Sequence, residues 1–255
     1  MTTSTHDLRA QEPLTRSEAV AMGRIEYTRF TDALKALDPQ DWQRPTECEG
    51  WTVRDLAGHL AGAMETARGL RHVLAEQRAI ARRRNETGES EIDAMSAVQI
   101  ANVATLEPDE LIEHMRALVE PAARGRSRVP APLARRIRFP VEMGSIRERW
   151  DLLYLNGIIL TRDTWLHRVA DLSRAVDQPP VLDATHDGHI VADVAAEWAR
   201  RHGQPVNLHL TGAAGGHYTA GIDGPTIELD AVEFCRILSG RAQPTHELLS
   251  TEVPF

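Results

Sequence analysis

Residues 51–64 read WTVRDLAGHLAGAM and predict an amphipathic helix inside a helical bundle. Thr52-Val53-Arg54-Asp55 has the spacing of a capping box, which begins a helix at the residue after the threonine. At ~100° per residue the apolar side chains of this helix form one stripe, with His59 at its border. The histidine side chain is therefore expected to face the interior of the bundle.

A second helix is predicted over 145–175 and carries two further polar side chains. Ser145-Ile146-Arg147-Glu148 has the pattern of a capping box, and apolar residues dominate the stretch that follows. Asp163 and His167 are four residues apart, so their side chains share one helix face. Two inward histidines and one carboxylate from facing helices are how bundles build metal sites. The sequence therefore offers His59, Asp163 and His167 as a ligand set.

Two nitrogen ligands and one oxygen ligand suit Zn²⁺, although Fe²⁺, Ni²⁺ and Mn²⁺ fit the same donors. Three protein ligands leave coordination positions open to water or substrate, which is typical of a catalytic site. Spacing alone leaves blander alternatives open. A histidine beside an apolar stripe is often a hydrogen-bonded core residue, and an Asp–His pair four apart is often a surface pair.

The rest of the chain predicts a mainly α-helical protein with a bundle over 1–178 and a small α+β domain over 181–255. Asp177-Gln178-Pro179-Pro180 is the clearest boundary. Residues 1–13 are expected to form a loose leader and 122–140 a loop. Helices are predicted over 16–37, 53–84, 92–103, 109–120, 189–201 and 232–238, and strands over 206–210, 217–222 and 226–229, the last two joined by a hairpin turn at Asp223-Gly224.

Composition narrows the class of protein. The net charge of −8 argues against a nucleic-acid binder, which needs a basic face. No apolar run is long enough to span a bilayer, so we expect a cytoplasmic protein without a membrane partner. Two distant cysteines, Cys48 and Cys235, form no disulfide framework and no C-x-x-C zinc motif, and a metal must then rest on histidines and carboxylates. Cys48 and Trp51 are interpreted as packing residues.

Three stretches resemble the mycothiol-dependent maleylpyruvate isomerase family, which belongs to the DinB-like four-helix bundles. Residues 42–60 (WQRPTECEGWTVRDLAGHL) resemble its first motif, 162–168 (RDTWLHR) its second, and 232–241 (VEFCRILSGR) its C-terminal helix and Gly-Arg ending. The resemblance covers nearly the whole chain. It implies a DinB-like metal-binding bundle followed by a small α+β domain.

The resemblance also implies a set of site residues. Zn²⁺, or another divalent metal, would be bound by His59, Asp163 and His167, and mycothiol would be the cosubstrate. Arg241 in the Gly-Arg ending would hold an anionic substrate group, against the alternative of a surface arginine at a helix end. The family's isomerases have Glu where this chain has Asp163. The family also has an Asp three residues after the second histidine, where this chain has Ala170 followed by Asp171.

The implied activity is that of an enzyme using a metal-bound thiolate. A free thiol has a pKa near ~8.5, and coordination to Zn²⁺ deprotonates it. The thiolate would isomerise a small electrophilic substrate about a double bond, or be transferred to it as an S-transferase. The alternatives are a non-catalytic DinB-like binding module and a natural-product biosynthetic enzyme with the same site. The expected partners are a small-molecule substrate and the thiol, with the protein a monomer or a homodimer.

Overall fold

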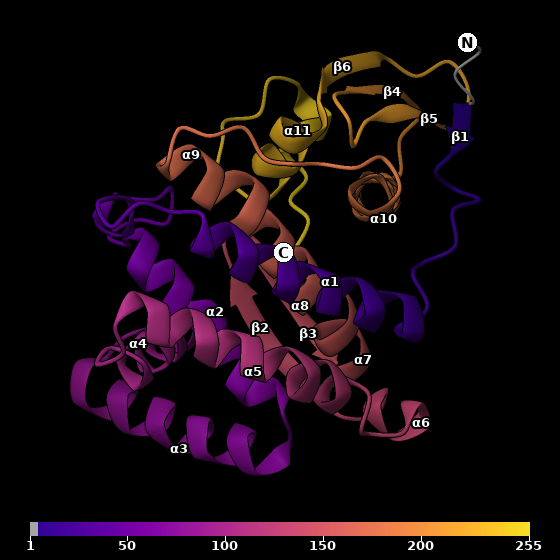
Figure 1. Ribbon diagram of the computed structural model, residues 1–255. Coiled ribbons are helices and arrows are strands. Elements are labelled where there is room, and N and C mark those ends of the chain that lie inside the picture. The colour runs from indigo at the N-terminus through magenta and orange to yellow at the C-terminus, as the bar shows by residue number, and fades with distance from the viewer. Residues whose placement is uncertain (1–4) are drawn as a thin grey trace. The chain divides into compact units, whose positions relative to one another are not determined.

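A computed structural model describes residues 5–255 of the chain (Figure 1). The chain divides into two compact units. The larger unit contains Arg16–Pro140 and Arg149–Pro179, and the smaller contains residues 5–15, Val141–Glu148 and Pro180–Phe255. This division differs from the predicted ranges 1–178 and 181–255, because two segments from the first part of the chain are grouped with the C-terminal residues.

The larger unit is helical, as predicted. Its bundle is formed by α1, α2, α5 and a composite helix over residues 152–175, with α2 packing on α4 and α5, and α1 packing on α5 and α8. Its helices are α1 (Arg16–Lys35), α2 (Val53–Ala67), α3 (Leu70–Thr87), α4 (Glu91–Asn102), α5 (Pro108–Arg126) and α6 (Ala131–Ala134), followed by the composite helix. A short 3₁₀ turn, Asp41–Gln43, lies between α1 and α2.

Helix α2 begins where the capping box predicts. The backbone N–H of Asp55 donates to Thr52 Oγ1 over 3.2 Å, and the N–H of Thr52 donates to Asp55 Oδ2 over 2.9 Å. The apolar stripe is fully buried, with Leu56 and Leu60 at most 1% exposed. A Cβ on Gly62 would overlap with Gln99 of α4, so this glycine allows the two helices to approach closely. The helix that carries His59 is thus fixed at its start and along its length.

The composite helix begins at Leu152, and the start predicted at residue 145 was wrong. Residues 138–151 form a hairpin instead, β2 (Arg138–Met143) and β3 (Ile146–Asp151), which turns at Gly144 with φ +55°. Ile146 and Trp150 are buried, whereas the arginines between them are exposed. This period of two belongs to a strand. The N-cap is Asp151, whose Oδ1 accepts from the N–H of Tyr154 over 2.9 Å.

Beyond its start the composite helix alternates between α and π turns. It consists of α7 (Leu152–Tyr154), a π-helical segment Leu155–Ile159, α8 (Leu160–Leu166), a second π-helical segment His167–Leu172, and α9 (Ser173–Ala175). Buried Arg126 donates to the carbonyl oxygens of Asn156 and Gly157 and to Thr161 Oγ1, so its guanidinium satisfies acceptors around the first π segment. π turns are rare and occur frequently at functional sites.

Two further expectations for this unit were wrong. The single helix predicted over 53–84 is divided at Gly69, whose φ of +148° is not helical, into α2 and α3. The loop predicted over 122–140 is also largely regular structure. Helix α5 runs through Pro121 to Arg126, so the start of the predicted loop 122–140 is helical. Proline removes one backbone donor, but the preceding turns of α5 bury a strong apolar face that holds the helix together. The remainder of that predicted loop contains α6 and the beginning of β2.

The smaller unit contains a four-stranded sheet in the order β1-β5-β4-β6. Helix α10 contacts β5, and α11 contacts β4 and β6. The elements are β1 (Thr5–Asp7), α10 (His186–His202), β4 (Val206–Thr211), β5 (Gly216–Ala220), β6 (Thr226–Asp230), α11 (Ala231–Leu238) and the 3₁₀ turn Glu247–Ser250. The predicted class, a mainly α-helical bundle followed by a small α+β part, is confirmed.

Two local predictions in the smaller unit were wrong. Residues 5–7 of the expected leader form β1, which pairs in parallel with β5; residues 1–4 lie outside the described part of the chain. The turn at Asp223-Gly224 does not join a paired hairpin, because β6 pairs in parallel with β4. Among the described residues, no helix has the length and apolar character needed to cross a membrane.

Candidate metal centre

Helix α2 places His59 on the inner face of the bundle, where the residue is 7% exposed. His59 Nε2 lies 3.8 Å from Asp163 Oδ2 on α8. Asp163 Oδ1 lies 3.2 Å from Nε2 of His167, the first residue of the second π segment. The three side chains predicted from the sequence therefore converge, two from the composite helix and one from α2.

The separations fit a shared cation. Ligand atoms about 2.1 Å from a tetrahedral Zn²⁺ stand about 3.4 Å from one another. One nitrogen of each histidine and one Asp163 oxygen all lie within 4.8 Å of each other. The distances from the Asp163 carboxylate oxygens to the Nε2 atoms of His167 and His59, 3.2 and 3.8 Å, lie on either side of the expected value. Small side-chain movements would bring all three atoms to bonding distance.

Asp171 completes the arrangement behind His167. Its side chain is 0% exposed, and its Oδ2 lies 2.5 Å from His167 Nδ1. A carboxylate at that distance holds the proton on Nδ1 and leaves the Nε2 lone pair free to bind a metal. A carboxylate behind a ligating histidine is the usual outer partner of such a ligand. Asp171, four residues after His167, thus reaches the ring of the histidine.

His59 has no such partner among the described residues. Its Nδ1 is buried and makes no hydrogen bond with any of them. The two histidines therefore differ in how their tautomers are determined: among the described residues, a hydrogen-bond partner fixes the tautomer of His167 but not that of His59. The residue after His167 is also held in place. Arg168 forms a buried bidentate ion pair with Glu26 of α1, over 2.7 and 3.0 Å.

Charge is distributed unevenly over the three residues. Burial acts to lower the pKa of His167, but the Asp163 charge and hydrogen bonds to Asp163, Asp171 and Cys48 hold it well above its ordinary value. Burial acts to raise the pKa of Asp163, but His167 and His59 hold it well below its ordinary value. In the metal-free site these shifts favour a proton on His167 that is paired with the Asp163 carboxylate. A metal ion would take the place of that proton.

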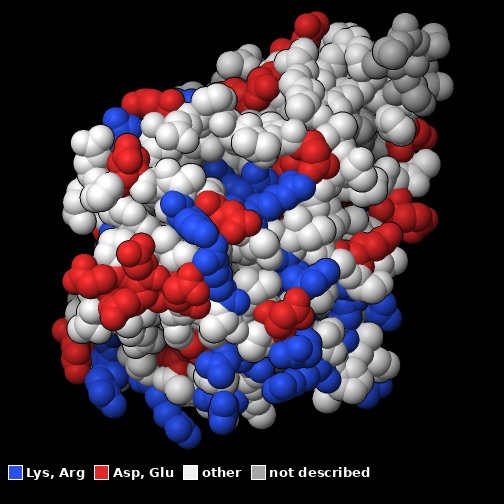
Figure 2. Space-filling view, in the orientation of Figure 1, with Lys and Arg blue, Asp and Glu red and all other residues white. Residues whose placement is uncertain are grey.

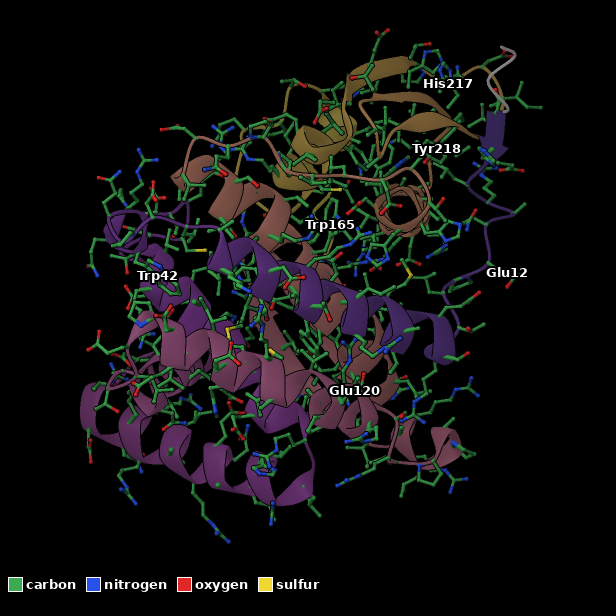
Figure 3. The ribbon with its side chains drawn as sticks, in the orientation of Figure 1. Glu12, Trp42, Glu120, Trp165, His217 and Tyr218 are labelled. Carbon is green, nitrogen blue, oxygen red and sulfur yellow. The ribbon has the colours of Figure 1, made fainter. Side chains whose placement is uncertain are left out.

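The three candidate ligands differ in their exposure to solvent. The Asp163 side chain is 22% exposed, whereas those of His59 and His167 are 9% and 5% exposed. The Asp163 carboxylate is therefore the most accessible of the three candidate ligands. Trp165, labelled in Figure 3, lies between the two ligands in sequence and is fully buried, which anchors α8.

Two residues interpreted from the sequence as packing residues lie at the site. The Trp51 ring is 5.0 Å from the His59 ring and 6.4 Å from the His167 ring, centroid to centroid. Half-buried Cys48 places its sulfur within 4.8 Å of ligand atoms of His167 and Asp171. The available signal was their position just before the helix that carries His59, because such residues lie beside its first turns.

Arg241 lies in the smaller unit, after the end of α11. It is half-buried, and its backbone N–H donates to the Arg236 carbonyl over 2.9 Å. The three ligand candidates belong to the larger unit. The predicted contact of Arg241 with an anionic substrate stays a prediction.

Comparisons with known proteins agree with the fold. Two solved structures, of a mycothiol-dependent maleylpyruvate isomerase and of its histidine-to-alanine mutant, each match with 19% identity and a TM-score of 0.53. The first match covers 94% of this chain and 95% of the other, and the mutant covers 90% of both. A search among curated proteins finds no match.

The sequence also matches a family model over residues 24–173, a range that includes all three ligand candidates and Asp171. That model describes the mycothiol maleylpyruvate isomerase N-terminal domain. Because the match extends over more than half of the 255 residues, the chain belongs to the mycothiol maleylpyruvate isomerase family.

Proposed function

We propose that this protein is a mycothiol-dependent enzyme that acts on a small electrophile at a divalent metal centre. His59, Asp163 and His167 would hold the metal, with Zn²⁺ the best match to two nitrogens and one carboxylate oxygen. The observation that carries the proposal is the convergence of these three side chains, with Asp171 fixing the tautomer of His167. The choice of mycothiol as the thiol rests on the family and on the isomerase named by the two similar structures.

The metal, when bound, would deprotonate the thiol, which has a pKa near ~8.5 when free. The side chains around it have separate tasks. Asp171 keeps the Nδ1 proton on His167 and so presents Nε2. Trp51 lies beside both imidazole rings and would limit access of water from its side. Asp163, the most exposed of the three, lies on the side by which the thiol and the electrophile would enter.

The reaction proposed first is cis–trans isomerisation. A thiolate adds to a carbon–carbon double bond that is conjugated to a carbonyl group, and the electron pair moves onto the carbonyl oxygen. Rotation about the resulting single bond, and return of the electron pair to expel the thiolate, give the other isomer and regenerate the thiolate. Displacement of a leaving group by the same thiolate would instead give S-transfer. Both reactions use the same three side chains.

The test combines metal content with a thiol-dependent assay. Protein purified without added metal is analysed by elemental mass spectrometry and then assayed with mycothiol and a panel of cis-enones and alkylating electrophiles. The His59→Ala variant should lose both metal and activity. His189→Ala, which removes an exposed histidine of the smaller unit, is the matched control and should retain both. Activity that survives His59→Ala unchanged would refute the proposal.

The two reactions differ in the fate of the thiol. Isomerisation leaves the concentration of free mycothiol constant while the substrate changes configuration. S-transfer consumes one thiol for each product molecule. Measurement of free thiol beside product formation therefore separates them. Protein that neither contains nor takes up a divalent metal, and that shows no turnover, would favour a non-catalytic binding module.

A further inference from the structure

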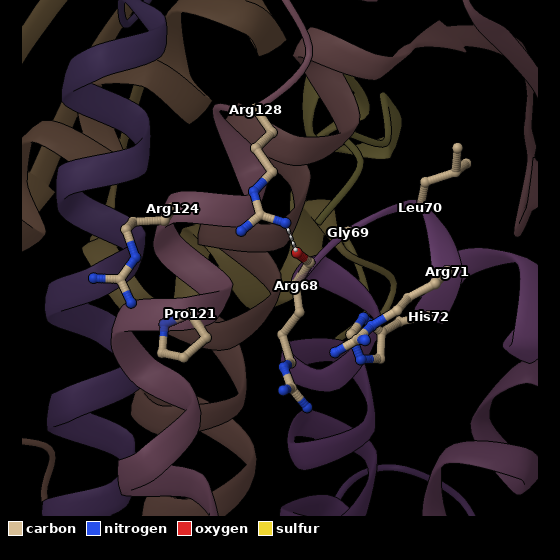
Figure 4. A pocket seen from close by; sticks show the side chains of 8 residues that line it. All are labelled: Arg68, Gly69, Leu70, Arg71, His72, Pro121, Arg124 and Arg128. Carbon is tan, nitrogen blue, oxygen red and sulfur yellow. Dashed lines mark hydrogen bonds between the residues drawn. The ribbon is translucent and has the colours of Figure 1, made fainter.

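A polar pocket lies at the C-terminal end of α2 (Figure 4). It has a volume of about 400 Å³, and arginine side chains dominate its lining. Helix α2 contributes Arg68 at its C-terminal end, α3 contributes Arg71, and α5 with the residues after it contributes Arg124 and Arg128. We call this cavity the arginine pocket.

The positive charge of the pocket is only partly neutralised. Glu65 pairs with Arg68 over 2.6 Å, and Glu120 lies 4.0 Å from Arg124. Among the described residues, no hydrogen bond or ion pair is found for the side chain of Arg71. The guanidinium of Arg128 donates to the carbonyl oxygen of Arg68 over 3.2 Å and has no carboxylate partner within the described part of the chain. A surplus of positive charge is therefore concentrated here, in a chain whose net charge is −8.

The lowered pKa of His72 on α3 is consistent with a positive potential in the pocket. His72 lines the pocket, and burial lowers its pKa, as do the neighbouring charges of Arg68 and Arg71, while Glu65 opposes them. Arginine repulsion that outweighs the one nearby carboxylate indicates a positive potential around the ring. Figure 2 shows Lys and Arg side chains gathered in the lower part of the face, over α3 and the end of α5.

The pocket is built by close backbone packing. A Cβ on Gly125 would overlap with the Ala67 carbonyl, so the end of α5 touches the end of α2 through this glycine. Gly69, with φ +148°, joins α2 to α3, and a Cβ there would stand 3.2 Å from the Arg128 guanidinium. Gly69 and Gly125 thus allow α2, α3 and α5 to pack closely and leave room for the Arg128 guanidinium.

The pocket is separate from the candidate metal centre. His59 and Arg68 are nine residues apart, which corresponds to a distance of about 13 Å along the axis of α2. Their directions around the axis differ by about 180°. Their side chains therefore leave opposite sides of the helix. The backbone N–H groups at the beginning of α3 add to the pocket, because no side chain caps this helix end at Gly69.

We propose that the arginine pocket binds a small phosphate-bearing anion. Guanidinium groups from three elements can reach a tetrahedral dianion from several directions, and each offers a fork of donors to two oxygens. The uncapped beginning of α3 favours the same ligand. A lone carboxylate would leave most of these donors unused. The shared chemistry is the phosphate group, whether free or carried by a small ester.

Isothermal titration calorimetry at constant ionic strength tests the proposal with three probes: inorganic phosphate, glycerol phosphate and succinate. The variants are Arg71→Gln and Arg128→Gln. The matched control is Arg82→Gln, which removes an exposed arginine of α3 outside the pocket. Circular dichroism checks that each variant folds, and zinc content is measured separately, so failure here is distinguishable from failure of the proposed catalytic site.

The expected result is saturable binding of one phosphate per chain, weakened about tenfold by either pocket variant and unchanged in the control. Tighter binding of glycerol phosphate than of phosphate would identify an ester as the ligand, and equal or weaker binding would identify the free ion. Three results would overturn the proposal: no saturable binding of either phosphate probe, equal affinities in the pocket variants and the control, or tighter binding of succinate than of both phosphate compounds.

Discussion

Replacement of Asp171 by Asn tests whether the protein fixes the tautomer of His167. The 2.5 Å contact between Asp171 Oδ2 and His167 Nδ1 is fully buried, so water cannot supply a substitute acceptor. An asparagine has the same shape without the charge, and its amide group can turn to donate to Nδ1. The imidazole proton then moves to Nε2 and points into the metal position.

The expected magnitude follows from the role of such partners. Loss of a carboxylate behind a ligating histidine lowers metal affinity about 10- to 100-fold, or roughly 1.4–2.8 kcal/mol of binding free energy. We expect the Asp171→Asn variant to fall in this range, with the upper end favoured because the contact is short and dry. Competition against a chromophoric chelator measures the zinc dissociation constant of each folded protein.

Asp177→Asn is the matched control for this substitution. Its side chain is 84% exposed, and its left-handed backbone, φ +54°, is one that asparagine tolerates. The control should bind zinc as the unmodified protein does. Equal zinc affinity of Asp171→Asn and the unmodified protein, with both shown to be folded, would refute the assignment of Asp171 as the partner of a metal ligand.

Further predictions concern pH and packing. Because the pKa of His167 is held above its ordinary value, its protonated form stabilises the metal-free fold below pH ~6.5, and this contribution is lost as pH rises through the higher folded value. Zinc competes with that proton, so zinc affinity should rise with pH in the competition assay, and a flat profile would contradict the ion-pair description. Arg126→Leu should lower the free energy of unfolding, measured by urea denaturation, by about 3 kcal/mol, because three acceptors lose their buried donor. A loss below about 1 kcal/mol would argue against a stabilising role of Arg126 in the first π segment. Gly62→Ala should destabilise by about 1–3 kcal/mol through overlap with α4, whereas Gly58→Ala, whose Cβ would meet ordinary contacts from 3.4 Å, should be neutral or stabilising; similar thermal shifts for both would be inconsistent with the packing.

The parts of the fold that local chemistry determines could be predicted from the sequence. The capping box of Thr52 and Asp55 fixes the beginning of α2, and helical periodicity then places His59 inward. The spacing of Asp163 and His167 places both on one face of a single helix. These inferences depend on contacts between residues a few positions apart.

Features that depend on distant segments were missed. The four residues 145–148 match a capping box, but pairing of β3 with β2 determines their conformation. Residues 5–7 carry little strand signal of their own and become β1 because β5 offers an edge. Cys48 and Trp51 come close to His167 only when α2 packs on the composite helix, more than a hundred residues later in the chain.

The wide turn over His167–Leu172 affects how the chain can change length. A π turn holds one residue more than an α turn requires, so a single-residue deletion within it can be absorbed by tightening that turn. Everything upstream, including Asp163, and everything downstream would keep its orientation. The same deletion between Asp163 and His167, at residues 164–166 of α8 (Leu160–Leu166), removes a residue that the α turn requires. It would rotate the two side chains relative to each other by about 100° and so separate Asp163 from His167. Insertions and deletions in relatives of this protein should therefore accumulate in the π segment and spare the α turn before it.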